Sequence, residues 1–282
     1  MQLKRLPTLL FCSAPTDFQD ALKLLEGSFV SIRNRQVGFV NPSVRDYLEE
    51  YLSDVNLLAH LAPTAQSARW TQELWQHYTS LKGHRSVSST SFVELFSDIA
   101  GLFKSLPVWR PAPHEPGVFR HSDLALTDRI KLLAEWQAIS LSAVFYGALR
   151  DVVFDTSEEF SAWLDGSDLP ELVWEFRGGK WSSLQGGGEI ADQLEGNLVK
   201  ILEGAAPSSA LNRIRESVEC MEEEAVSERV IDTLKSAIMF ELGQTSLNID
   251  DFDSETELED HVERLEGLAS GQTLMPLGLS DV

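Results

Sequence analysis

The sequence of 282 residues predicts a mainly α-helical fold with one small β-hairpin near its N-terminus. Apolar side chains recur at helical spacing along most of the chain, and several of these stretches open with a helix-capping pattern of Ser or Thr followed three residues later by Glu or Gln. Two short β-prone runs predict the hairpin. The helices are expected to form an irregular bundle or array, because the sequence contains no fixed-period repeat.

The hairpin leads into a capped helix. The predicted strands are Phe29–Ile32 and Val37–Val40. Asn41 is a favourable N-cap residue, and Pro42 suits the first turn of the helix that follows. A capping pattern at Thr16 opens another helix upstream. Because helix, hairpin and helix in this order form the last part of a winged helix, residues 1–60 are predicted to be a truncated winged-helix-like segment.

Three segments are expected after this one. They are a helical connector at residues 63–106, a Pro-rich linker at 107–123 and an acidic helical domain at 124–282. Four prolines in residues 107–117 exclude a helix or a central strand there. One long helix is expected from Leu124 to Val153. Other helices are expected at residues 54–61, 63–81, 91–106, 156–166, 190–202, 210–221, 226–242 and 254–266, whereas residues 172–176 fit either a strand or a helix.

Net charge limits the partners that the chain can bind. The total is −21, but residues 1–120 carry +1 and residues 121–282 carry −22. A field of this sign repels nucleic-acid phosphates and anionic lipid, so neither nucleic acid nor a membrane is expected as a partner. The acidic half either keeps the chain soluble or meets a basic protein.

The cysteines and the hydropathy indicate a cytoplasmic protein. Cys12 and Cys220 are too few and too distant to form a disulfide framework or a zinc site. No window approaches 18 uninterrupted apolar residues, so no membrane helix is expected.

Motifs for catalysis are missing, and we expect no enzymatic activity. Lys180 follows Gly179 as in a phosphate-binding loop, but Trp181 stands where a Ser or Thr must hold magnesium. The acidic run after Asp250 has alternate carboxylates, yet Thr256 occupies the position of the glycine that a calcium loop requires. The histidines are scattered, so the sequence predicts no metal site.

One stretch resembles a known family. The segment Ala21–Phe29, followed by Val37–Leu48, resembles the winged-helix portion of bacterial STAND-type P-loop NTPases, and the "novel STAND" group of defence systems is the nearest in wording. In that family the winged helix follows an ATPase domain, and a helical arm or sensor region comes after it. The resemblance therefore implies ATP or ADP and magnesium only on an upstream ATPase domain, and no cofactor in this chain.

The resemblance also implies roles for three residues. Asn41 matches the position at which many relatives carry a histidine that contacts the β-phosphate of ADP. It is thus a candidate nucleotide-sensing residue, or alternatively only a helix cap. Arg45 and Asp46 match the family wording and are expected to form an interdomain contact or a local structural pair.

Two functions remain open at this point. The first is a non-catalytic regulatory or sensor region that contacts an upstream or separate NTPase domain, and also a protein ligand or further copies of itself. In that case the chain is a fragment, a split gene product or a remnant. The alternative is a freestanding acidic binding protein, of the immunity or inhibitor type, that captures a basic partner.

Overall fold

The computed structural model describes residues 29–33, 36–41, 43, 53–81, 88–112, 117–204, 206–221 and 225–245. This part is mainly helical, as predicted, and it carries two small antiparallel strand pairs. Its α-helices are α3 (Val55–Leu61), α4 (Ala68–Ser80), α5 (Ser89–Glu94), α6 (Ser97–Ala100), α7 (Leu126–Ser140), α8 (Ala143–Asp155), α9 (Leu169–Arg177), α10 (Gly187–Glu203), α11 (Ser208–Glu219) and α12 (Glu228–Thr245). Two short 3-10 helices are η1 (Ala62–Thr64) and η2 (Phe103–Ser105), and the strands are β1 (Val30–Arg33), β2 (Gln36–Phe39), β3 (Trp109–Pro111) and β4 (Phe119–His121).

The N-terminal hairpin is present where the sequence predicts it. Strands β1 and β2 are antiparallel, with Val30 opposite Phe39 and Arg33 opposite Gln36. The strands begin and end within one residue of the predicted positions. The helix predicted from Thr16 lies outside the described residues, as does most of the helix after Asn41, so the complete winged helix stays a prediction.

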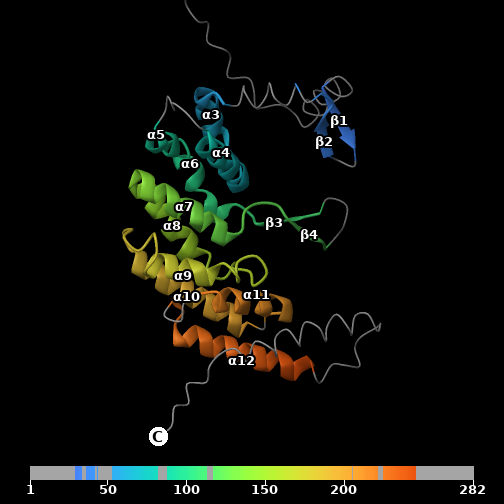
Figure 1. The fold of residues 1–282 in the computed structure, drawn as a ribbon, viewed down its shortest axis with the longest axis vertical. Coiled ribbons are helices and arrows are strands. Elements are labelled where there is room, and N and C mark those ends of the chain that lie inside the picture. The colour runs from blue at the N-terminus through green and yellow to red at the C-terminus, as the bar shows by residue number, and fades with distance from the viewer. Residues whose placement is uncertain are drawn as a thin grey trace, which may run out of the picture.

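The helices stack in successive layers along the long axis of the molecule (Figure 1). Helices that are neighbours in sequence pack together, α7 on α8 and α9 on α10, while α10 also packs on α8 and α12. One continuous cluster of buried apolar side chains runs through these layers, from Val55 in α3 to Ile238 in α12. Each helix therefore turns an apolar face toward the adjoining layer, which is the expected behaviour of an amphipathic helix.

Aromatic side chains fill the core where α4, α5, α7 and α8 meet. The rings of Tyr78 and Phe92 are stacked with centroids 4.0 Å apart, and Phe96 stacks on Trp136 at 4.9 Å. Phe145 meets Trp136 edge-on. All five side chains are fully buried. Each such aromatic pair contributes about 0.5–1.5 kcal/mol to stability beyond the burial of its apolar area. The cluster therefore fixes how α4 and α5 pack against α7 and α8.

The prediction of one long helix from Leu124 to Val153 was wrong. The chain breaks between α7 and α8 at Leu141, whose backbone is left-handed with a φ of 54°. Ser142 then caps α8, because its side chain accepts a hydrogen bond from the backbone N–H of Val144. The break lets α8 fold back against α7.

Three other segments also differ from the predicted elements. The region predicted as one helix at residues 91–106 contains the short helices α5, α6 and η2, and Ser88 caps the first of them. Residues 156–166, where a helix was predicted, form turns and a short irregular stretch. Residues 172–176, which fitted a strand or a helix, belong to α9.

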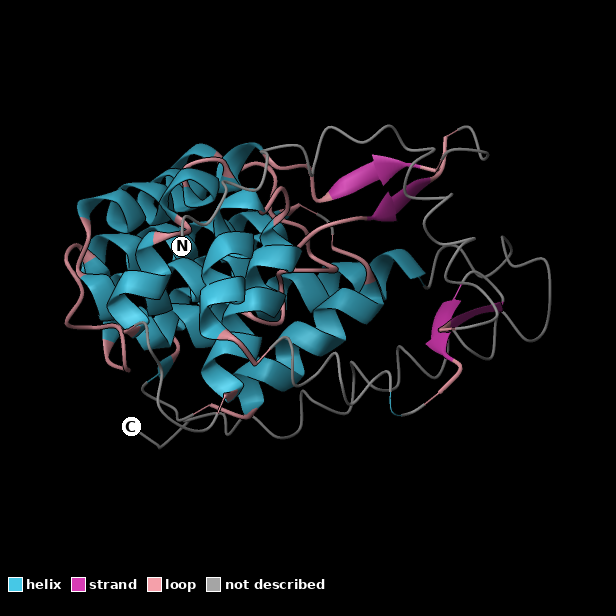
Figure 2. Cartoon of the chain, turned by 90° about the horizontal axis from the view of Figure 1, so that it is seen from above, coloured by secondary structure: helices cyan, strands magenta, loops and turns pink. Residues whose placement is uncertain are grey.

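The Pro-rich segment 107–123 contains the strand pair β3–β4. This pair leaves the helical stack between η2 and α7, and the helices before and after it share the same core. In Figure 2 both strand pairs lie to one side of the helices. Among the described residues, no helix is long and apolar enough to span a lipid bilayer.

Candidate interaction surface

Strands β3 and β4 form a two-stranded ribbon that projects from the helices (Figures 1 and 2). Trp109 lies opposite His121, Arg110 opposite Arg120, and Pro111 opposite Phe119. The backbone ladder extends one step past each end of this register. At those steps the N–H of Ala112 donates to Val118 O at 2.8 Å, and the N–H of Ser122 donates to Val108 O at 2.9 Å.

The two faces of the ribbon carry different side chains, because neighbouring residues of a strand point to opposite faces. One face bears Trp109 and Phe119, with His121 edge-on to the Trp109 ring at 5.6 Å. The other face bears Arg110 and Arg120 directly across from each other. Trp109 is 43% exposed and Phe119 is 61% exposed. Exposed aromatic rings beside arginines are the composition that protein interfaces favour.

A buried carboxylate holds the base of the ribbon against the helices. Asp123 follows β4 and is 1% exposed. Its Oδ1 accepts from the backbone N–H groups of Arg69 at 2.7 Å and Leu124 at 2.8 Å, and its Oδ2 accepts from the N–H of Ala68 at 3.1 Å. The first turn of α4 thus donates to a carboxylate that also stabilises the positive end of the helix dipole.

A buried arginine holds the chain just before the ribbon. Arg129 of α7 donates from Nη1 to the carbonyl oxygens of Phe103 and Leu106. Burial lowers the pKa of Arg129, while the charges of Asp123 and Asp165 oppose this shift. The side chain is fully buried, so its guanidinium serves the fold and is not part of the exposed surface.

A third arginine, Arg69 of α4, lies beside the base of the ribbon, next to His121 of the aromatic face. Nη2 of Arg69 lies 3.3 Å from Nδ1 of His121 and 3.5 Å from the backbone carbonyl oxygen of Asp123. In a chain whose net charge is −21, Arg110 and Arg120 therefore lie on one face of the ribbon and Arg69 lies beside its base at the other face. Like charges directly opposite each other weaken a strand pair, so an arriving carboxylate would be attracted to this place. The ribbon is suited to bind an acidic surface that also offers apolar contacts.

The residues predicted from the sequence lie elsewhere. Asn41 is exposed, and its Oδ1 accepts from the backbone N–H of Ser43 at 3.0 Å, which is the hydrogen bond of a helix cap. The geometry leaves its nucleotide-sensing role a prediction. Arg45 and Asp46 lie outside the described residues. Within the described residues, no group of three or more His, Cys, Asp or Glu side chains is arranged to hold a metal ion.

Sequence reasoning missed the ribbon because it treated residues 107–123 as a linker. A signal was present. The runs Val108–Ala112 and Val118–Ser122 both begin with Val, an aromatic residue and Arg in that order. The stretch between them contains Pro and Gly and is suitable for a turn. Proline is tolerated at such an edge position, since an exposed strand does not need every N–H.

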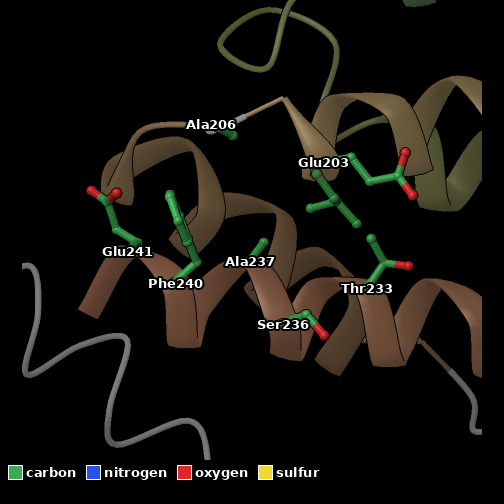
Figure 3. Close-up of a pocket in the computed structure, with 8 residues that line it drawn as sticks. Glu203, Ala206, Thr233, Ser236, Ala237, Phe240 and Glu241 are labelled. Carbon is green, nitrogen blue, oxygen red and sulfur yellow. The ribbon is translucent and has the colours of Figure 1, made fainter. Parts of the chain in front are cut away.

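Two surface hollows lie among the C-terminal helices α9 to α12. One, of about 360 Å³, lies between α10 and α12 and is shown in Figure 3. We call it the α10–α12 groove, and its lining residues are Leu202, Glu203, Ala206, Thr233, Ser236, Ala237, Phe240 and Glu241. The other, of about 420 Å³, lies beside Trp174 and Cys220.

Comparison with known proteins identifies no relative: no protein-family model, no curated protein and no solved structure matches this chain.

Proposed function

We propose that this chain is a regulatory region without catalytic activity of its own, which acts through contacts with other protein surfaces next to a STAND-type ATPase domain. The observation that carries the proposal is the β3–β4 ribbon, an exposed element with one aromatic and one arginine face. The hairpin β1–β2 followed by the cap at Asn41 supports the link to STAND proteins, because the resemblance requires this local structure.

The ribbon has the properties of a contact surface. An isolated two-stranded hairpin is marginally stable in water, yet this one is held at its base by Asp123. Anchoring reduces the conformational entropy that binding would otherwise cost. Trp and Arg side chains in such positions carry a large share of the binding energy at protein interfaces.

Two buried carboxylates of the described residues are committed to the fold. Asp165 accepts from the N–H and hydroxyl of Thr127 and from the N–H of Ser161. Asp123 is engaged in the same way with backbone donors. These contacts position helices, and both carboxylates are almost fully buried and occupied by donors of the chain, which supports a binding role over acid–base chemistry.

Affinity capture tests the proposed partner. The tagged chain is incubated with a lysate of its native host at about 0.1 M salt, washed with about 1 M salt, and the retained proteins are identified by mass spectrometry. Raising the salt over this range shortens the Debye length from about 10 Å to about 3 Å. We expect a P-loop NTPase to be retained, because packed interdomain contacts depend little on salt. A basic protein that the wash releases would instead establish the freestanding acidic binder.

A nucleotide titration tests the regulatory role separately. Calorimetry with ATP and with ADP, each with magnesium, is expected to give no heat of binding to the isolated chain. The phosphate-binding loop and the magnesium ligands would belong to the ATPase domain. Binding of either nucleotide at micromolar concentration would overturn the proposal.

A further inference from the structure

The outer edge of β4 carries backbone groups that are open to pairing. In an antiparallel ladder, pairs that exchange two hydrogen bonds alternate with pairs whose N–H and C=O groups point away from the partner strand. The ladder bonds place the bonded pairs of the ribbon at positions 108/122, 110/120 and 112/118. Phe119 and His121 therefore direct their backbone groups outward. Among the described residues these groups have no hydrogen-bond partner.

The outer edge of β3 is less suited to pairing. Its outward-facing residues are Trp109 and Pro111, and Pro111 has no N–H to donate. Proline on an edge strand is one of the devices that prevent pairing with another strand. The β4 edge, by contrast, offers an N–H and a C=O at each of two alternate residues, which is the spacing at which a neighbouring strand pairs. Of the two edges, β4 is the one open to an added strand.

A third strand would complete the ribbon as a sheet. All three residues of β4 are exposed, and the ribbon projects from the helical stack (Figure 1). Two strands alone are marginally stable in water, whereas three strands with an apolar face can be stable. Because Asp123 already anchors the base of the ribbon, an added strand does not have to order the ribbon first.

We infer that β4 binds an extended segment of a partner protein as a third, antiparallel strand, and that this segment carries an acidic residue between two apolar residues. The apolar residues lie opposite Phe119 and His121, on the face of the exposed aromatic rings, where aromatic and β-branched side chains pair well across strands. The acidic residue lies opposite Arg120 on the other face. This inference rests on the proposed function, in which the ribbon is a contact surface, and it names the kind of segment that the ribbon contacts.

The arginine face selects the acidic residue. The residue opposite Arg120 would form a non-hydrogen-bonded pair with it, with Cα atoms about 4.5 Å apart, so a carboxylate there can reach the guanidinium group. Arg120 also interacts within its own chain. Arg110, directly across from it on the same face, forms no ion pair with another described residue. The face thus retains positive charge, which favours a carboxylate over an ammonium group on the added strand.

A second copy of β4 is a poor occupant of this edge. In the symmetric antiparallel register, Phe119 of each copy lies opposite His121 of the other. Arg120 then lies directly opposite Arg120 of the second copy, and like charges in that position weaken a strand pair. A strand of different sequence avoids this repulsion.

Matched peptides test the pairing. The isotope-labelled full chain is titrated at about 0.1 M salt with acetyl-Ser-Val-Glu-Val-Ser-amide, and backbone amides are followed by heteronuclear NMR. One control peptide is N-methylated at the first Val, whose N–H would point to β4. A second is N-methylated at Glu, whose N–H would point away. A third carries Lys in place of Glu.

The expected affinities discriminate among these peptides. Methylation at Val should weaken binding on the order of ten-fold, because it removes a donor and places a methyl group against β4, whereas methylation at Glu should leave binding within about two-fold. The Lys peptide should bind several-fold more weakly. The parent peptide should slow hydrogen exchange at the amides of Phe119 and His121, but not at Arg120, which already pairs with Arg110.

Two protein variants test the same hydrogen bond from the other side. His121→Pro and His121→Ala both lack the imidazole, but only His121→Pro lacks the outward N–H. We expect His121→Pro to bind the parent peptide on the order of ten-fold more weakly than His121→Ala does. Circular dichroism and the remaining amide signals verify that both variants are folded.

Three results would overturn the inference. They are a parent peptide that fails to bind β4, a Val-methylated peptide that binds as well as the parent, and slow exchange at Phe119 and His121 before any peptide is added. The last would mean that the edge is already occupied.

The outcome also separates this inference from the function on which it rests. A chain that captures a P-loop NTPase but does not bind the parent peptide at β4 would refute strand addition and leave the proposed function in place. Methylation-sensitive binding at β4, in a chain that captures no such protein, would support strand addition and refute the role beside an ATPase.

Discussion

Removing the carboxylate of Asp123 should release the ribbon from α4. In Asp123→Ala, three backbone N–H groups lose their acceptor, and those of Ala68 and Leu124 are buried. A buried donor left without a partner costs about 1–3 kcal/mol, and loss of a cap costs about 1 kcal/mol. Because water can reach the half-buried N–H of Arg69, we expect a loss of about 3 kcal/mol in the free energy of unfolding.

Thermal and urea unfolding measure this loss. For a chain of this size about 3 kcal/mol corresponds to a fall in Tm of roughly 6–12 °C. Asp123→Asn keeps one carbonyl oxygen as an acceptor and should lose about 1 kcal/mol. Asp192→Ala, an exposed aspartate on α10, serves as the control and should change stability by less than about 0.5 kcal/mol. If Asp123→Ala matches this control, the carboxylate does not hold the ribbon as described.

Three other substitutions test the fold. Burial raises the pKa of Asp165 above its usual 3.8, so its folded form holds the proton more tightly than the unfolded chain does. Wild-type stability relative to Asp165→Asn should therefore fall as the pH rises from about 3.8 through the raised pKa and then level off, as urea titrations at several pH values would show. Leu141→Gly relieves a left-handed backbone at a side chain that is 75% exposed, so it should raise the free energy of unfolding by about 0.5–1 kcal/mol, and a fall in Tm would contradict the assigned backbone. Trp136→Ala should cost about 3–5 kcal/mol in urea unfolding, whereas Trp163→Ala, which is 51% exposed, should cost less than about 1 kcal/mol.

The sequence predicts best the elements whose apolar pattern decides their structure. Helices α10, α11 and α12 lie where an apolar stripe at helical spacing predicted them, since each buries that stripe against its neighbours. The β1–β2 hairpin follows from β-prone runs on both sides of a short polar connection. In these elements the local preference and the tertiary contacts agree.

Breaks in helices are harder to predict. Leucine is a strong helix former, so Leu141 gives no local warning that the chain leaves α7 there. Ser142 was the available signal, since serine is a preferred N-cap residue. The packing of Phe145 against Trp136 across the two helices stabilises the folded-back arrangement, and a pattern within one helix cannot show that contact.

The candidate contact surfaces depend on tertiary structure. Glu203 and Glu241 come from different helices, and only the packing of α12 on α10 brings them to one groove. Likewise, Asp123 lies 55 residues after Ala68 in the sequence, and only the folded chain brings its carboxylate to the first turn of α4. Neither arrangement has a spacing in the sequence that would reveal it.

The anchoring of the ribbon also bears on the order in which the chain folds. The hydrogen bond between Ala68 and Asp123 joins residues 55 positions apart. Closing a loop of this length is slow compared with forming the helices inside it, because the entropy cost must be met before the contact is made. The ribbon is therefore anchored only after the helices between these two residues have formed, and a nascent or partly folded chain does not yet hold it in place.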